Sequence, residues 1–284
     1  MPELPEVEIT ARLIDAALAG AQVESAIAPG VNALKTFDPP LSAIEGQRFL
    51  WVRRRGKLFV LELDGGLALV VHLMSAGRLQ IFDTRASLRD RTSRLLVRLT
   101  DGRELRLREF GTRQRAWVKL LRTAELCDDE TLAALGPDVW PDPPPLPELA
   151  ELLDQSRPLY ALLRDQHVLA GIGRSWVDEI LHTAMLSPFK RGSDLEPDEA
   201  ERLRAATVRR LGDAIDHYQQ AIALPIPDKL PMPLAVHRRN GEPCPRCGDR
   251  LEAVFYEDYV MCYCPTCQTE GKVLKDRRLS RLLK

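Results

Sequence analysis

The chain has 284 residues, and its 40 Lys plus Arg residues nearly balance its 41 Asp plus Glu residues, for a formal net charge of -1. This length allows two domains with separate cores, and the near-neutral charge excludes a uniformly basic nucleic-acid-binding chain. No uncharged run approaches the ~20 residues of a bilayer-spanning helix, and the start lacks a signal-peptide pattern, so we expect a cytoplasmic protein without a membrane partner.

The first predicted element is a helix over residues 2–19. Pro2 suits a first helical turn, apolar residues such as Ile14 and Leu18 recur at helical spacing, and Gly20 ends the pattern.

The pair Pro2-Glu3 also indicates chemistry. Once Met1 is removed, Pro2 carries a free secondary amine, and such an amine can attack an electrophilic carbon to form an iminium ion. Glu3 is adjacent and can move protons during those steps. The same two residues also suit an ordinary helix start, and on these residues alone that structural interpretation is the commoner one.

From about residue 20 to 122 the pattern favours strands. Short apolar runs rich in β-branched and aromatic residues are separated by turn signals at 64–66 and 101–102. The most distinct runs are 49–52, 58–61, 67–72 and 95–99. We expect an antiparallel sandwich or barrel behind the N-terminal helix.

A proline-dense stretch predicts a linker over residues 137–147. Beyond it the pattern is helical as far as the long predicted helix 197–221, with a tight glycine turn at 170–173 between two helices. The stretch 223–235 is rich in Pro and Leu, which indicates an irregular connection.

Six cysteines in a cytoplasmic protein favour metal ligands or free thiols over disulfides. Four of them form two CxxC pairs separated by sixteen residues, which is the spacing of a closed, structural four-thiolate zinc site. Cys262 is not expected to be a ligand, and Cys127 is expected to be a lone buried thiol. The predicted zinc ligands are Cys244, Cys247, Cys264 and Cys267.

Basic residues gather at 53–57, 103–122 and 272–284, whereas acidic residues concentrate at 125–154 and 194–201. A neutral protein with segregated charge can present a basic face to phosphates. For any single cluster taken alone, a solvated strand or helix face is the commoner interpretation.

Several separated motifs resemble the formamidopyrimidine-DNA glycosylase/endonuclease VIII family. They are the start Met1–Glu8, the segment 165–173 continuing to Leu181, the segment 239–268 with its cysteines, and Leu135-Gly136-Pro137-Asp138 before the linker. The resemblance covers residues 1–268 in the same order, which makes the structural interpretation of Pro2-Glu3 less probable.

The resemblance implies an α+β multidomain fold in which an N-terminal helix and β-sandwich precede a helix–two-turn–helix domain and a C-terminal zinc-ribbon finger. We assign the catalytic sandwich domain to 1–136, the linker to 137–147, the helix–two-turn–helix domain to 148–236, the zinc finger to 237–268 and a basic tail to 269–284.

The resemblance also implies a bifunctional DNA glycosylase and AP lyase of base-excision repair. Pro2 would attack the sugar C1′, Glu3 would protonate the ring oxygen, and β,δ-elimination would break the strand. Glu6 matches a second family carboxylate, and Lys57 matches a catalytic-site lysine that contacts phosphate. The implied partner is double-stranded DNA with damaged bases or abasic sites, the implied cofactor is one structural zinc ion, and the implied state is a monomer.

This sequence departs from the family pattern at several expected DNA contacts. Arg174 stands where the family usually has Asn, Tyr259 aligns with an expected Arg, and Tyr160 aligns with an expected Lys. The residues that fill the gap left by a flipped base also differ, and the candidates in the matching loops are His72, Met74, Arg113 and Gln114. Met74 is equally consistent with a core residue in a strand.

The loop that caps 8-oxoguanine in the guanine-specific branch is not visible, and residues 221–229 take its place. We therefore expect a lesion range that is not limited to 8-oxoguanine. The basic tail is consistent with nonspecific phosphate contacts or with a solvated helix.

Two other functions fit part of the pattern. A catalytically weak protein that binds damaged or abasic DNA would explain the replaced phosphate contacts, but it has no need of Pro2, Glu3, Glu6 and Lys57. A zinc-ribbon transcription factor leaves the N-terminus unexplained.

Overall fold

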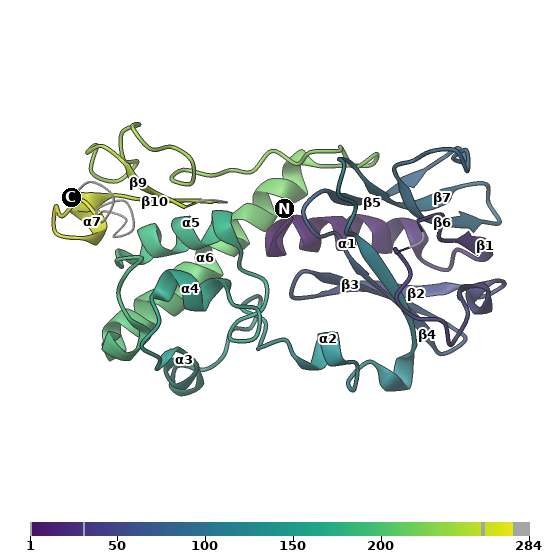
Figure 1. Cartoon of the computed structure of the whole chain (residues 1–284), viewed down its shortest axis with the longest axis horizontal. Helices are drawn as coiled ribbons and strands as arrows, with labels where there is room; N and C mark the ends of the chain where they lie inside the picture. Colours follow the sequence, from purple (N-terminus) through teal and green to yellow (C-terminus); the bar gives the residue numbers. More distant parts are fainter. Residues whose placement is uncertain (1, 31, 257–258, 275–284) are drawn as a thin grey trace. The chain divides into compact units, whose positions relative to one another are not determined.

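The computed structural model describes residues 2–30, 32–256 and 259–274. The chain divides into two compact units, each of which is described by itself (Figure 1). The first unit comprises Met1–Ala134 and Ile215–Pro231, and the second comprises Leu135–Ala214 and Met232–Lys284.

The first unit begins with helix α1 (Leu4–Leu18), drawn in purple in Figure 1. The helix starts two residues later than the sequence predicted because Glu3 is extended and forms a capping box with Glu6. The chain leaves the helix through Gly20, whose φ of +70° is readily accessible only to glycine.

Two four-stranded antiparallel sheets follow, which confirms a sandwich. One sheet has the order β1 (Val23–Ile27), β6 (Ser93–Leu99), β7 (Glu104–Glu109), β5 (Gly77–Phe82). The other has the order β2 (Phe49–Arg55), β3 (Leu58–Leu63), β4 (Leu67–His72), β8 (Trp117–Arg122). The short helices of this unit are η1 (Leu41–Ile44), η2 (Thr123–Glu125) and α2 (Glu130–Ala133).

The core of the first unit joins one face of α1 to residues of both sheets. Ile14 and Leu18 of the helix are fully buried, as are Phe59 of β3 and Val97 of β6. Removing a ring such as that of Phe59 would cost about 3–5 kcal/mol, because both the transfer free energy and a cavity term are lost. This core therefore holds the start of α1 against the sandwich.

Residues 222–231 also belong to the first unit and are pinned to one sheet. Ile226 lies in the core, and its carbonyl accepts a hydrogen bond from Gln80 Nε2 at 2.6 Å. Asp228 pairs with Arg108 at 3.3 Å, and its carbonyl accepts from Arg78. The segment that follows the long helix is thus tied to β5 and β7.

The second unit is helical, as predicted. Its elements are α3 (Leu146–Leu153), α4 (Leu159–Arg164), α5 (Arg174–Ala184), η3 (Gly192–Asp194) and the part of α6 (Pro197–Ala221) that ends at Ala214. No helix among the described residues is both long and apolar enough to cross a bilayer.

The turn between α4 and α5 is organised by one side chain. Gln166 Nε2 donates to the carbonyls of Arg164 and Ile172, both at 2.8 Å, and Gln166 Oε1 accepts from the Gly171 amide at 3.0 Å. Gly171 has a φ of +113°, which only glycine adopts without strain. The turn therefore sets the direction in which α5 begins, at Arg174.

The cysteine segment forms a hairpin, with β9 (Glu252–Phe255) antiparallel to β10 (Val260–Tyr263). The short helix α7 (Pro265–Gln268) follows directly. Val236 and Leu251 form a small core with three buried cysteines, and Ala253, Val260 and Cys267 pack against it.

Candidate active site, metal centre and nucleic-acid contacts

Pro2, Glu3 and Glu6 lie together at the start of α1. Pro2 is partly exposed, whereas only 2% of Glu3 and 4% of Glu6 are exposed. The Glu3 amide donates to Glu6 Oε2 at 2.8 Å, and the Glu3 carboxylate accepts the Glu6 amide. Pro2, which would carry the amine, is thereby held at a solvent-accessible position beside the two buried carboxylates.

Tyr218 completes this carboxylate network. Its hydroxyl donates to Glu6 Oε1 at 2.8 Å, although the two residues are 212 positions apart. Burial raises the pKa of Tyr218 well above its usual range, and Glu6 raises it further, so the phenol remains a donor. Sequence reasoning missed Tyr218 because one tyrosine on the buried face of a long amphipathic helix gives no separate signal.

Lys57 lies in the turn between β2 and β3 and is only 8% exposed. Gly56 beside it has a φ of +58°, so the turn depends on glycine. The positive charge of the Lys57 ammonium acts on the pKa of His72. His72 lies opposite Leu58, the residue after Lys57, where β4 pairs with β3. Burial lowers the pKa of His72 to about 4, with Lys57 as a second cause, and the imidazole is therefore neutral near pH 7.

Helix α1 is braced directly to the strand that leads into this turn. Asp15 Oδ1 accepts the Val52 amide at 2.6 Å, and Arg54 Nε donates to Glu8 Oε2 at 3.0 Å. The Arg54 side chain is only 4% exposed, so this ion pair is well shielded from solvent. The elements that carry Pro2 and Lys57 are consequently held together within one unit.

His72 also supports Met74 in the turn between β4 and β5. The Met74 amide donates to His72 Nδ1 at 3.2 Å, and Met74 Sδ lies 2.7 Å from the same nitrogen. Met74 has a φ of +50°, a left-handed conformation that is uncommon for a residue with a side chain. The strand-core interpretation of Met74 is wrong, because Met74 is partly exposed and lies outside both strands.

Arg113 and Gln114 have different surroundings. Arg113 is exposed. The side-chain nitrogen Nε2 of Gln114 is already hydrogen-bonded within the fold. It donates to the Arg91 carbonyl at 2.8 Å and to the Glu109 carbonyl at 3.2 Å. Arg113 is therefore the more accessible of these two predicted DNA contacts.

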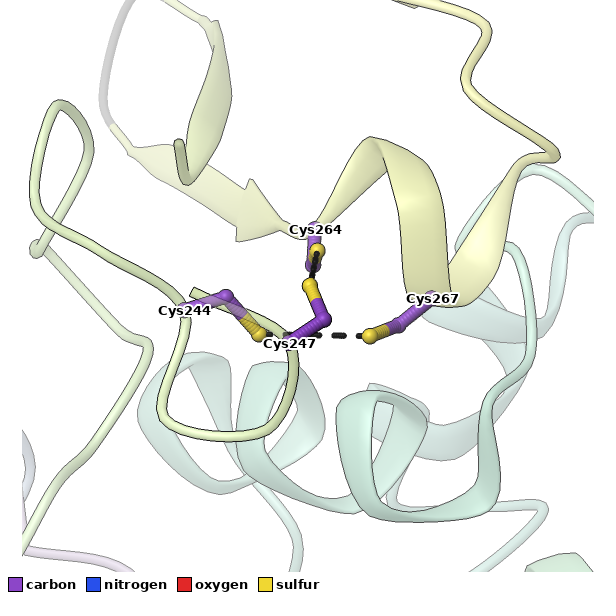
Figure 2. Close-up of side chains that lie close together, drawn as sticks. All are labelled: Cys244, Cys247, Cys264 and Cys267. Carbon is purple, nitrogen blue, oxygen red and sulfur yellow. Dashed lines mark hydrogen bonds between the residues drawn. The ribbon is translucent and has the colours of Figure 1, made fainter. Parts of the chain in front are cut away.

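The four predicted zinc ligands converge, as Figure 2 shows. Their sulfur atoms all lie within 4.8 Å of one another, with Cys247 to Cys264 at 3.5 Å and Cys244 to Cys267 at 3.9 Å. A tetrahedral ion with metal–sulfur bonds of ~2.3 Å needs sulfurs ~3.8 Å apart, so the group fits one ion.

The surroundings of the cysteines support ligation. Burial opposes ionisation of Cys244, but the amides of Cys247 and Arg246 outweigh it and lower the pKa of Cys244. His182 Nε2 lies 3.1 Å from Cys244 Sγ, the kind of outer contact that orients metal ligands. Cys262 lies outside the group, as predicted, whereas the expectation that Cys127 is buried is wrong, since it is exposed.

Two adjacent acids of α5 anchor the cysteine segment. Glu179 Oε1 accepts the amides of residues 235, 236 and 237 at 3.0, 2.8 and 2.9 Å, and Arg210 pairs with Glu179 at 3.1 Å. Asp178 Oδ2 accepts the Cys262 amide at 3.0 Å and lies 2.6 Å from His237 Nδ1. Burial raises the pKa of Asp178 to about 7, and His237 opposes that shift. The hairpin is thereby attached to the helix that begins at Arg174.

Three positions that depart from the family pattern lie in one aromatic and cationic cluster. The Tyr160 and Tyr259 rings stack with centroids 5.8 Å apart, and Tyr256 stacks on Tyr259 at 4.3 Å. The guanidinium carbon of Arg174 lies 5.0 Å from the Tyr259 centroid. Arg164, which the sequence did not single out, lies 4.6 Å from the same centroid.

Comparison with known families gives two matches along the chain. The model of the formamidopyrimidine-DNA glycosylase N-terminal domain matches residues 1–114, and that of the formamidopyrimidine-DNA glycosylase H2TH domain matches residues 135–225. A formamidopyrimidine-DNA glycosylase of Thermus thermophilus is 33% identical over 291 residues, covering 95% of this chain and all of that protein.

Comparison with solved structures gives matches to the same family. The crystal structure of MutM (Fpg) from Thermus thermophilus matches with a TM-score of 0.80 at 32% identity, covering 95% of this chain and 100% of that one. A MutM in complex with DNA containing carbocyclic 8-oxo-G matches with a TM-score of 0.83 at 25% identity, covering 94% of this chain and 100% of that one. The chain belongs to the formamidopyrimidine-DNA glycosylase family.

Proposed function

We propose that this protein is a bifunctional DNA glycosylase and AP lyase of base-excision repair with the amine of Pro2 as its nucleophile. The observation that carries the proposal is the partly exposed Pro2 beside the buried carboxylates of Glu3 and Glu6. Membership of the family supports the reaction class. Processing that removes Met1 is required, because an amide nitrogen cannot attack.

The reaction follows from the chemistry of a secondary amine. The Pro2 nitrogen attacks C1′ of the damaged nucleotide, the glycosidic bond breaks, and the base leaves with a proton. Glu3 protonates the sugar ring oxygen, which opens the ring and leaves a cationic iminium. Loss of the C2′ proton then expels the 3′ phosphate, and a second elimination expels the 5′ phosphate.

Glu6 and Lys57 have supporting roles in this scheme. Glu6 holds the Glu3 amide and thus the start of α1. We assign it to the base-side wall of the site because it matches the second family carboxylate. Lys57 supplies a shielded positive charge for a phosphate, and such a charge is strongest where water is excluded. The neutral His72 beside it adds no second positive charge near pH 7.

Zinc is the metal that four cysteine thiolates at these distances fit best, and a closed four-thiolate site has a structural role. The proposed partner is duplex DNA with a damaged base or an abasic site, and a similar MutM has been solved in complex with DNA that contains carbocyclic 8-oxo-G. We propose a monomer, because all residues assigned to the reaction come from one chain. We also propose that the protein acts in the bacterial cytoplasm.

We further propose a lesion range that is not limited to 8-oxoguanine. The segment that replaces the guanine-specific capping loop is held on the sandwich through Ile226 and Asp228. A segment tied down in this way has little freedom to close over one particular base. Cleavage rates on a panel of oxidised purines and pyrimidines test this proposal, and strict preference for 8-oxoguanine would contradict it.

Borohydride trapping tests the nucleophile directly, because reduction of the iminium leaves a covalent protein–DNA adduct. We expect an adduct with abasic-site DNA from protein whose free Pro2 is verified by intact mass. The adduct should be lost when one extra residue precedes Pro2, reduced when Pro2→Gly replaces the secondary amine by a primary one, and strongly reduced in Glu3→Gln. Glu24→Gln, an exposed carboxylate of β1, is the matched control. No adduct from the verified wild-type protein would overturn the proposal.

A second candidate function is binding of abasic DNA with little catalysis. The observation in its favour is that Tyr160, Arg174 and Tyr259 replace expected phosphate contacts. Tight binding to abasic DNA by protein with a free Pro2, without an adduct or cleavage, would favour this function.

A further inference from the structure

The cluster around Tyr259 joins three elements of the second unit. Tyr160 and Arg164 come from α4, Arg174 is the first residue of α5, and Tyr259 directly precedes β10. Two cationic groups therefore meet at one aromatic ring, although they are ten residues apart in sequence and separated by the glycine turn.

Arg164 carries a charge that no acid among the described residues neutralises. Its guanidinium carbon lies 4.9 Å from the Tyr160 centroid and 4.6 Å from the Tyr259 centroid. Within residues 2–30, 32–256 and 259–274, no carboxylate forms an ion pair with it. Other partly buried arginines, such as Arg54, Arg98 and Arg210, each pair with an acid, so Arg164 is a candidate for an anionic ligand.

The aromatic rings hold both guanidinium groups in place. Tyr160 is only 4% exposed, and Tyr259 is supported by Tyr256, whose amide donates to the Tyr259 carbonyl at 2.9 Å. A guanidinium stacked on a ring loses side-chain freedom before any ligand arrives. Arg164 and Arg174 are both partly exposed, so solvent and ligands reach them.

A phosphodiester is the ligand that this arrangement fits. Guanidinium groups match phosphate oxygens in a two-pronged geometry, and two fixed cations suit one negatively charged group. A stacked nucleobase fits less well, because Tyr160, Tyr256, Arg164 and Arg174 already surround the Tyr259 ring.

We infer that Arg164 and Arg174, held against Tyr259, form a binding site for a backbone phosphate of the DNA. The inference rests on the proposed function, since it takes duplex DNA as the ligand. In this site the positive charge comes from α4 and α5, and the hairpin contributes an aromatic ring that positions both arginines. The three departures from the family pattern thus act together as one rebuilt site.

The test is equilibrium binding to a duplex that contains tetrahydrofuran, an abasic analogue that cannot form an iminium. At about 0.1 M salt, Arg164→Ala and Arg174→Ala should each weaken binding about tenfold, the scale of one charge-assisted contact. The double variant should lower the magnitude of the salt slope by about 0.9 for the phosphate released. Arg209→Ala, an exposed arginine of α6 in the same unit, is the control and should leave both quantities unchanged.

Tyr259 is a positioning residue, and its variants separate that role from simple folding. Tyr259→Phe should keep wild-type affinity because it retains the ring, whereas Tyr259→Ala should weaken binding as the arginine variants do. Metal content and thermal melting should match the wild type in every variant that enters the comparison. If Tyr259→Ala differs from the wild type in metal content or melting, Arg164→Ala and Arg174→Ala alone test the phosphate site.

Wild-type affinity and salt slope in both arginine variants would overturn the inference, even if borohydride trapping succeeds. Failure of trapping with the expected losses in Arg164→Ala and Arg174→Ala would instead refute the proposed chemistry and leave the phosphate site standing.

Discussion

Buried carboxylates at the N-terminus of α1 illustrate how single residues set up this site. A buried charge is tolerated only when hydrogen bonds replace the lost water. Glu6 meets that need through the Glu3 amide and the Tyr218 hydroxyl, each at 2.8 Å. The network that satisfies Glu6 is therefore the same network that holds the start of the chain.

Tyr218→Phe should destabilise the protein by about 1–3 kcal/mol, because it leaves a buried carboxylate without one donor. Denaturant unfolding measures this change. In a Glu6→Gln background the same substitution should cost less, since a neutral amide oxygen accepts a weaker hydrogen bond. Equal costs in the two backgrounds would show that Tyr218 does not act through Glu6.

His72 should make stability depend on pH. Its pKa falls from an ordinary value near 6.5 to about 4 on folding, so the unfolded chain binds the proton more readily between these values. The stabilisation from the neutral ring is present above pH 6.5 and is lost as the pH falls towards 4. The unfolding free energy of the wild type minus that of His72→Gln should rise with pH across this window. A difference in unfolding free energy that does not change with pH would contradict the lowered pKa of His72.

Helix α5 shows how one element serves two parts of its unit. Its first residue, Arg174, joins the aromatic cluster, while Asp178 and Glu179 one turn later bind the segment that leads to the hairpin. A single rigid helix thus relates the cluster to the metal module. Any change that loosens this helix should affect both.

Glu179→Ala should release residues 235–237, because three backbone amides lose their acceptor. Removal of a buried acceptor that also pairs with Arg210 should cost about 3–5 kcal/mol. Hydrogen exchange by mass spectrometry should show faster exchange at those amides. Glu201→Ala, an exposed glutamate of α6, is the control, and unchanged exchange in Glu179→Ala would contradict the anchoring role.

At the scale of the whole molecule, two units with different sources of stability share one chain. The first has a large apolar core between two sheets, whereas the hairpin of the second has a small core built partly from cysteines. We expect a small four-cysteine module of this kind to depend on a bound metal, because metal binding supplies much of the folding free energy of such modules.

Removal of the metal should therefore unfold the cysteine module without unfolding the first unit. A strong chelator should abolish exchange protection in residues 244–268 and leave the strands of the first unit protected. Cys247→Ser should lower the metal content from one ion per chain, and Cys127→Ser should not, because Cys127 lies outside the sulfur cluster. Uniform loss of protection across both units would contradict this independence.

Local patterns predicted the elements whose periodicity is simple. Strands β3 and β4 are continuous apolar runs, and α1 has a clear apolar face, so each was located from its residues. Strand β7 was not placed individually, because its sequence ELRLRE is rich in charge. Glu104 is fully buried there and pairs with Arg106 and Arg98, so an ion-pair network replaces part of the usual apolar pattern.

The sequence by itself determined the cysteine cluster and the Pro2-Glu3 start, because CxxC spacing and a capped helix are local properties of the chain. Tertiary structure alone decided that Tyr218 holds Glu6 and that Tyr160, Arg164, Arg174 and Tyr259 meet. These contacts join residues far apart in the chain, and their distances depend on how turns and helices pack. Local sequence therefore indicates the groups proposed to break bonds, whereas packing decides which groups meet in the proposed phosphate site.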